Sequence, residues 1–150
     1  MLTMSLARAT TPDIDPDSAF NAQVARCTGS HWRAGHAQKS SFRACFIGDK
    51  MVLLEERVGQ PHKELSMRYF YGDGVLIGYR GVRSAGKTGA GSAALSDTVP
   101  VLIDWETTGQ PRRAVRLEHY GEVRLTAMEI QAIRLRGQQL AQLALTPVAP

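Results

Sequence analysis

Long apolar runs, cysteine and low-complexity segments are all scarce in this chain of 150 residues. No uninterrupted apolar run approaches the roughly 20 residues that a membrane-spanning helix requires, which excludes such a helix. Glycine and proline number 14 and 7, far below a collagenous or low-complexity share. The two cysteines would be consumed by one bridge. What remains is the composition of a single soluble globular domain with one core.

The net charge of +4 is unevenly distributed. Residues 108–150 carry 6 basic and 3 acidic groups, whereas the rest of the chain is nearly balanced. Such a patch could contact nucleic-acid phosphates or an acidic protein partner, although spaced arginines are more often solvated faces of strands and helices. The sequence favours the solvated interpretation. The arginines concerned are Arg112, Arg113, Arg116, Arg124, Arg134 and Arg136.

The N-terminal residues resemble the end of an export leader. Ala7 and Ala9 form the small-residue pattern of a cleavage site, although the segment is too short for a complete signal peptide. We therefore interpret residues 1–14 as a leader remnant or disordered tail, and residues 15–150 as one domain. This interpretation predicts a periplasmic protein. The alternative is a short tail on a cytoplasmic protein.

The two cysteines favour the same compartment. A bridge between Cys27 and Cys45 would close a loop of 19 residues, which the chain-entropy model values at about 3 kcal/mol. It would also restrain residues 29–41, a polar segment that has little hydrophobic content. The alternatives are two free thiols in a reducing cytosol, or a zinc site that adds His31 and His36, for which the spacing is weak evidence.

Short periodic segments predict the secondary structure. Asp15 before Pro16 is typical of a helix start, and apolar spacing predicts a short helix over 16–26. The polar segment 29–41 and the segment 81–97, rich in glycine, alanine and serine, predict loops. Strands are expected over 42–47, 50–58, 64–71, 75–80, 99–106 and 113–119.

Two elements have especially clear signatures. A Gly-Asp-Gly turn at 72–74 predicts a hairpin, with Leu65, Met67, Tyr69 and Tyr71 on one face. Thr126 with Glu129 forms a capping-box pattern that begins a C-terminal helix, in which Gly137 costs about 1 kcal/mol. The helix should bury one stripe, formed by Ile130, Ile133, Leu140, Ala141 and Ala144.

Consecutive strands between two helices predict an α+β fold. We expect an antiparallel sheet of about 4–6 strands with an N-terminal and a C-terminal helix packed on it. A parallel, doubly wound sheet is disfavoured because strands and helices do not alternate along the chain.

One segment spells a phosphate-binding loop. Gly81, Gly86, Lys87 and Thr88 match G-x-x-x-x-G-K-[ST], and Asp104 ends an apolar segment as a magnesium-supporting aspartate would. That chemistry needs a helix directly after the loop and a parallel sheet, whereas residues 89–97 are poor helix formers. The favoured interpretation is a long connection between two hairpins.

The hairpin sequence carries a family resemblance. Tyr69-Phe70, Asp73-Gly74 and Leu76, followed by a second strand-turn-strand unit with Gly109 in its turn, resemble small exported bacterial proteins of uncharacterised function that contain Tyr-Phe-x-x-Asp-Gly-x-Leu hairpins. The resemblance covers roughly residues 50–145. It implies an antiparallel α+β fold and a periplasmic location, and it supplies no catalytic residue.

These observations favour a non-enzymatic periplasmic binding protein, most concretely an inhibitor or immunity protein that occludes a cell-envelope-targeting enzyme or toxin. The expected partner has an acidic cleft, entered by the 81–97 connection with its Arg83 and Lys87. No cofactor and no metal are expected. The alternatives are a nucleotide-binding enzyme that uses the phosphate-loop residues, a structural envelope protein, and a nucleic-acid binder. Further candidate contact residues are Trp32, Arg112 and Arg113.

Overall fold

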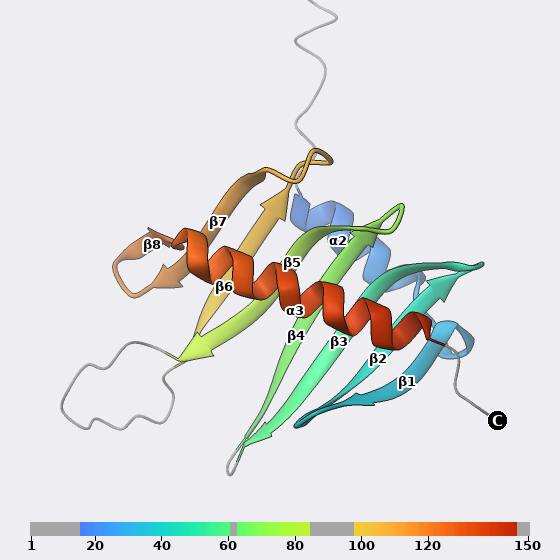
Figure 1. Ribbon diagram of the computed structural model, residues 1–150. Coiled ribbons are helices and arrows are strands. Elements are labelled where there is room, and N and C mark those ends of the chain that lie inside the picture. The colour runs from blue at the N-terminus through green and yellow to red at the C-terminus, as the bar shows by residue number, and fades with distance from the viewer. Residues whose placement is uncertain (1–15, 61–62, 85–97, 147–150) are drawn as a thin grey trace, which may run out of the picture.

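A computed structural model describes residues 16–60, 63–84 and 98–146 of the chain. Eight strands form one antiparallel sheet in which spatial order equals chain order, with a helix against each face (Figure 1). The elements in sequence are α2 (Pro16–Arg26), η1 (Gly29–His31), β1 (Trp32–Ala37), β2 (Ser40–Ile47), β3 (Lys50–Gln60), β4 (Lys63–Gly72), β5 (Val75–Ser84), β6 (Thr98–Trp105), β7 (Pro111–Glu118), β8 (Gly121–Arg124) and α3 (Ala127–Leu145).

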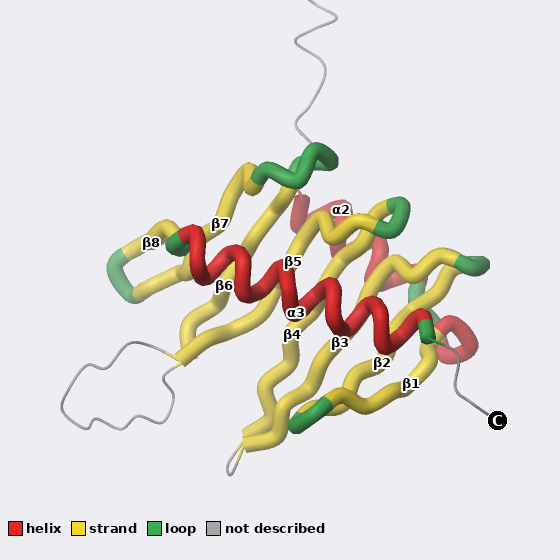
Figure 2. Tube along the Cα trace, viewed as in Figure 1, coloured by secondary structure: helices red, strands yellow, loops and turns green. Residues whose placement is uncertain are grey.

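Tight turns join several consecutive strands (Figure 2). Asp73 and Gly74 between β4 and β5 have φ values of 51° and 82°, a conformation that glycine and aspartate tolerate. The hairpin predicted from the Gly-Asp-Gly sequence is therefore confirmed. The β1–β2 turn likewise places Lys39 at a φ of 66°.

Helix α3 covers one face of the sheet and closes the larger core. Thr126 and Glu129 form the predicted capping box, and the predicted stripe from Ile130 to Ala144 packs against the sheet. Gly137 has a packing reason: a Cβ there would lie 2.9 Å from Leu76 Cδ2. Absence of that atom lets the helix backbone approach closely enough for Tyr71 Oη to donate to the Gly137 carbonyl at 2.7 Å.

Helix α2 covers part of the opposite face, which we call the α2 face. Phe20 stacks on Phe70 with ring centroids 4.3 Å apart, and it lies over Gly78, where a Cβ would be 2.3 Å from its ring. The Cys27–Cys45 disulfide joins the end of α2 to β2, as the sequence predicted. The predicted bounds of this short helix are confirmed.

The sheet has eight strands within the described residues, so the prediction of 4–6 was too low. The first missed strand, β1, lies in the segment predicted as a polar loop. It is an edge strand in which no residue is fully buried, so its sequence lacks an apolar alternation. The other, β8, has four exposed residues. Strand β5 also runs to Ser84, which corrects the prediction that a loop begins at Gly81.

Neither helix in the described part of the chain combines the length and apolar character needed to cross a membrane. The leader prediction for residues 1–14 lies outside the described residues.

Candidate protein-binding face

Three arginines and one glutamate form a row across four adjacent strands on the α2 face. Arg43 of β2 is in register with Glu55 of β3, Glu55 with Arg68 of β4, and Arg68 with Arg80 of β5. The row shares one face because the same register position on neighbouring antiparallel strands points to the same side. We call Arg43, Arg68 and Arg80 the arginine row.

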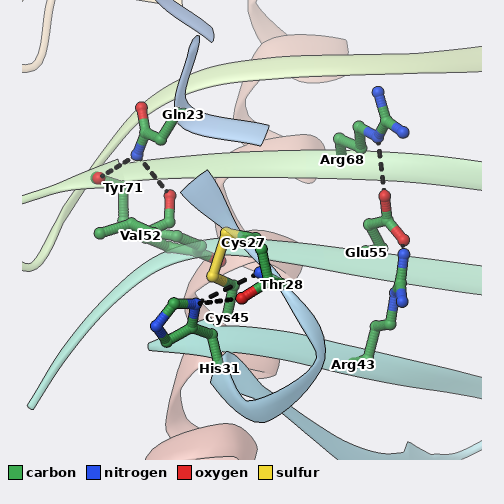
Figure 3. Close-up of a disulfide and its surroundings, with 10 residues drawn as sticks. All are labelled: Gln23, Cys27, Thr28, His31, Arg43, Cys45, Val52, Glu55, Arg68 and Tyr71. Atoms are coloured by element: carbon green, nitrogen blue, oxygen red, sulfur yellow. Dashed lines mark hydrogen bonds and ion pairs between the residues drawn. A yellow bond between two sulfur atoms is a disulfide. The ribbon is translucent and has the colours of Figure 1, made fainter. Parts of the chain in front are cut away.

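Glu55 holds two members of the row in place (Figure 3). Its carboxylate accepts hydrogen bonds at 2.8 Å from Arg43 Nε and from Arg68 Nε, one on each oxygen. Burial alone would raise the pKa of Glu55, but the hydrogen bonds and charges of both arginines outweigh burial, so the pKa lies below its ordinary value. One buried carboxylate therefore supports two guanidinium groups.

Arg43 and Arg68 use only part of their hydrogen-bonding capacity. Within the described residues, each donates through Nε, and neither forms a hydrogen bond through its Nη atoms. Their side chains are 41% and 42% exposed. Arg43 also lies over the Trp32 ring, 3.8 Å from its centroid, which restricts its motion. The result is a pair of positioned guanidinium groups with solvent-facing donors.

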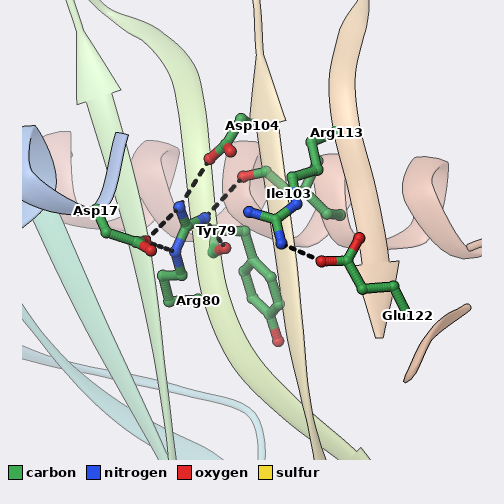
Figure 4. Close-up of polar contacts among 7 residues, drawn as sticks. All are labelled: Asp17, Tyr79, Arg80, Ile103, Asp104, Arg113 and Glu122. Carbon is green, nitrogen blue, oxygen red and sulfur yellow. Dashed lines mark hydrogen bonds and ion pairs between the residues drawn. The ribbon is translucent and has the colours of Figure 1, made fainter. Parts of the chain in front are cut away.

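Arg80 is instead fully engaged within the protein (Figure 4). Its Nη2 lies 2.8 Å from Asp17 of α2 and 2.9 Å from Asp104 of β6. Its Nη1 donates to the carbonyls of Tyr79 and Ile103. At 18% exposure, this side chain anchors the start of α2 to the sheet rather than facing solvent.

An open groove of about 460 Å³ lies beside Arg68. It combines cationic and hydroxyl groups with an aliphatic wall, a mixture suited to a partner that presents both carboxylates and apolar side chains. Its principal lining residues are Ser66, Arg68, Arg80, Pro100, Leu102 and Leu117.

The structure separates the predicted partner-binding residues. Trp32 supports the arginine row, and Arg113 lies on the α2 face, where it pairs with Glu122 of β8. Arg112 is exposed and lies at the register shift between β6 and β7, between the residues that pair with Asp104 and Trp105. Lys87 lies outside the described residues.

Arg83 lies in a strand and not on a loop, which corrects its predicted placement. It belongs to β5, opposite Val99 of β6, and its guanidinium forms an ion pair with Glu129 of α3. This contact commits the side chain to the α3 face.

The strands around Gly81 do not have the arrangement that the phosphate-loop hypothesis requires. Gly81 lies inside β5, and β5 pairs with β6 in antiparallel fashion, whereas that chemistry needs a parallel sheet. Asp104, the proposed magnesium-supporting residue, is 3% exposed and paired with Arg80. Gly86, Lys87 and Thr88 lie outside the described residues.

The described residues also give little support to the two remaining alternatives, a zinc site and nucleic-acid binding through the C-terminal arginines. Cys27 and Cys45 are consumed by the disulfide, and the described residues contain no cluster of three metal-ligating side chains. Four of the six C-terminal arginines have partners inside the protein: Arg113 with Glu122, Arg116 with Glu118, Arg134 with the Gly109 carbonyl, and Arg136 with Glu56.

A second buried carboxylate, Glu56, lies under α3. Arg136 Nη2 approaches it at 2.6 Å, and Tyr69 Oη donates to it at 3.1 Å. Burial and the nearby Glu56 charge raise the pKa of Tyr71 and of Tyr79. These contacts join α3 to the sheet, so we assign the cluster a structural role.

Sequence reasoning missed the arginine row. Arg43, Glu55 and Arg68 lie on separate strands, and the charge pairing becomes visible only after the strand register is known. The available signal was a charged residue next to apolar neighbours in each of three predicted strands.

Comparison with protein-family models, with curated proteins and with solved structures found no match.

Proposed function

We propose that this protein is a non-enzymatic binding protein that recognises an acidic protein surface through Arg43 and Arg68 of the arginine row. The observation that carries the proposal is the pair Arg43 and Arg68, held by Glu55 with their Nη donors facing solvent. Guanidinium groups restrained in advance lose less entropy on binding carboxylates, and they form geometrically specific contacts.

The groove beside Arg68 supports a protein partner over a small anion. Leu102 and Leu117 offer apolar contact area next to the cationic groups. Arginine beside apolar side chains is typical of the energetically important centre of protein interfaces. A carboxylate-bearing loop or strand of a partner could place its acidic groups on the row and its aliphatic groups in the groove.

The disulfide supports an oxidising compartment, because such bonds persist in the periplasm and outside cells. Within the binding-protein class we therefore place the chain in the periplasm as an inhibitor or immunity protein, which occludes an enzyme or toxin that acts on the cell envelope. The acidic cleft of that partner would meet the arginine row, not the 81–97 connection inferred from sequence.

Charge removal on the row tests the proposal. Tagged wild-type protein and the variants Arg43→Gln and Arg68→Gln are used to capture partners from envelope extracts of the source organism. Each variant should reduce recovery of the same partner about tenfold, as loss of a central arginine contact costs roughly 1–2 kcal/mol. Each keeps the other arginine on Glu55, and urea unfolding checks that it folds.

Arg112→Gln is the matched control, because Arg112 is exposed and lies on β7, which β5 and β6 separate from Arg68 of β4. Its recovery should equal that of the wild type. Equal recovery with all three variants would contradict the proposed surface. Inhibition of the captured protein's enzymatic activity by one equivalent of the wild-type chain would then test the inhibitor assignment.

A further inference from the structure

A second groove lies at the edge of the sheet on the α3 side, away from the arginine row. It has a volume of about 540 Å³ and runs between edge strand β1 and the C-terminal end of α3. Its apolar floor includes Phe42 and Phe46, Leu143 lies on the side formed by α3, and the charged or titratable lining residues are Arg33, His36 and Asp49. The proposed function makes no use of it.

The floor of the groove depends on a glycine. A Cβ at Gly35 would lie 2.4 Å from Phe42 Cζ, so the bare backbone of β1 allows the Phe42 ring to lie beneath it. Leu143 is 48% exposed on the other side of the groove. The groove therefore presents aromatic and aliphatic atoms directly beside the backbone of β1.

The backbone of β1 is itself an unpaired hydrogen-bonding surface. Strand β1 pairs with β2 alone and forms one end of the sheet within the described residues. A two-residue turn closes this hairpin on Ala37 and Ser40, and hydrogen-bonded pairs alternate with non-bonded pairs along an antiparallel ladder. By this alternation Gly35 bonds to β2, whereas Ala34 and His36 direct their N–H and C=O groups to the open edge.

Arg33 favours a ligand that carries a negative charge. Its guanidinium lies over the Phe46 ring, 4.1 Å from the centroid, at the wall of the groove. Within the described residues it forms no ion pair, although acidic partners occupy most of the arginines on the sheet. Asp49 also lines the groove but forms no ion pair with Arg33, so a carboxylate brought in by a ligand would meet a guanidinium that has no ion-pair partner among the described residues, beside apolar surface.

We propose that β1 binds an extended peptide as a ninth, antiparallel or parallel strand, with an apolar side chain of that peptide in the groove and an adjacent acidic side chain on Arg33. Main-chain hydrogen bonds to the edge would supply affinity, and the groove would supply specificity. The site is distinct from the arginine row, so it provides a second point of attachment for the same partner or for another protein.

The test first selects peptides that bind and then identifies the groups of the protein and of the peptide on which binding depends. Random eight-residue peptides displayed on phage are selected on the intact wild-type protein, and enriched peptides are synthesised with a fluorescent label for anisotropy titrations. We expect an apolar residue next to aspartate or glutamate to recur among them. Leu143→Ser should weaken their binding about tenfold, because it removes apolar surface from the groove.

Two controls separate strand addition from unspecific apolar binding. Leu135→Ser removes the same side chain from the same helix at 49% exposure but outside the groove, so affinity should be unchanged. Ala34→Pro removes an outward N–H at an edge position that tolerates proline, and it should also weaken binding about tenfold. Peptides N-methylated at alternate backbone amides reproduce that loss without altering the protein.

Failure to enrich any peptide would overturn the proposal. So would peptides that bind wild type, Leu143→Ser, Leu135→Ser and Ala34→Pro with equal affinity, or N-methylated peptides that bind as tightly as their parents. Because neither Arg43 nor Arg68 is altered, these outcomes leave the test of the arginine row independent.

Discussion

Reduction of the disulfide should destabilise the protein by a predictable amount. Cys27 and Cys45 are 18 positions apart, and the chain-entropy relation for a loop of that length gives about 3 kcal/mol. The loss should arise in the unfolded chain, because α2 has other contacts that do not depend on the disulfide. Phe20 stacks on Phe70, and Gln23 donates to the Val52 carbonyl at 2.7 Å.

Urea unfolding with and without a reductant measures this loss. With an m-value of about 2 kcal/mol per molar, the midpoint should fall by about 1.5 M on reduction, and the slope should change little if the folded state is intact. The double variant Cys27→Ala with Cys45→Ala should match the reduced wild type and should not respond to the reductant. A difference below about 1 kcal/mol between oxidised and reduced protein would refute the reasoning.

Three further predictions concern single side chains. Tyr71→Phe should cost about 0.5–1.5 kcal/mol in the free energy of unfolding, because it removes the hydrogen bond that Tyr71 Oη donates to the buried Gly137 carbonyl; a cost near zero would contradict the contact. Thr126→Ala should cost about 1 kcal/mol through loss of the α3 cap, with reduced helical circular dichroism at intermediate urea as the check. Since the pKa of Glu55 is lowered on folding, its contribution to stability is complete above the ordinary value of 4.5 and is lost as pH falls below it. Urea titrations at decreasing pH should therefore show a smaller loss of stability for Glu55→Gln than for wild type. If the free energy of unfolding fell equally with pH in both proteins, the result would contradict the lowered pKa of Glu55.

Local signals in the sequence predicted the elements with strong patterns. The Gly-Asp-Gly turn and its aromatic flanks predicted the β4–β5 hairpin, and Met67, Tyr69 and Tyr71 do face the core beneath α3. The capping box predicted where α3 begins. These signals are reliable because turn and cap geometry depend on a few neighbouring residues.

Features that depend on tertiary neighbours were harder to predict. Gly137 weakens an isolated helix, yet here it permits the close approach of α3 to Leu76. Likewise the sequence predicts a loop at Arg83, because the residue follows the strand expected over 75–80 and precedes a glycine-rich segment, whereas it lies in β5 and pairs with Glu129 of the distant helix α3. Local composition carries no information about either contact.

The candidate binding face was the least predictable feature. Trp32 and Arg113 were recognised as candidates from residue type alone, but their roles follow from pairing partners on other strands. Arg43 and Arg68 became candidates only because Glu55 holds them side by side. Strand register, which the sequence specifies weakly for a sheet with polar edges, determines this arrangement.

Chemical footprinting of arginines tests the central claim most directly. The protein is treated with phenylglyoxal, free and bound to its captured partner, and modification at each arginine is quantified by mass spectrometry. The arginine-row account predicts that the partner protects Arg43 and Arg68, while exposed Arg112 remains as reactive as in the free protein. Unchanged reactivity of Arg43 and Arg68 in the complex would contradict it.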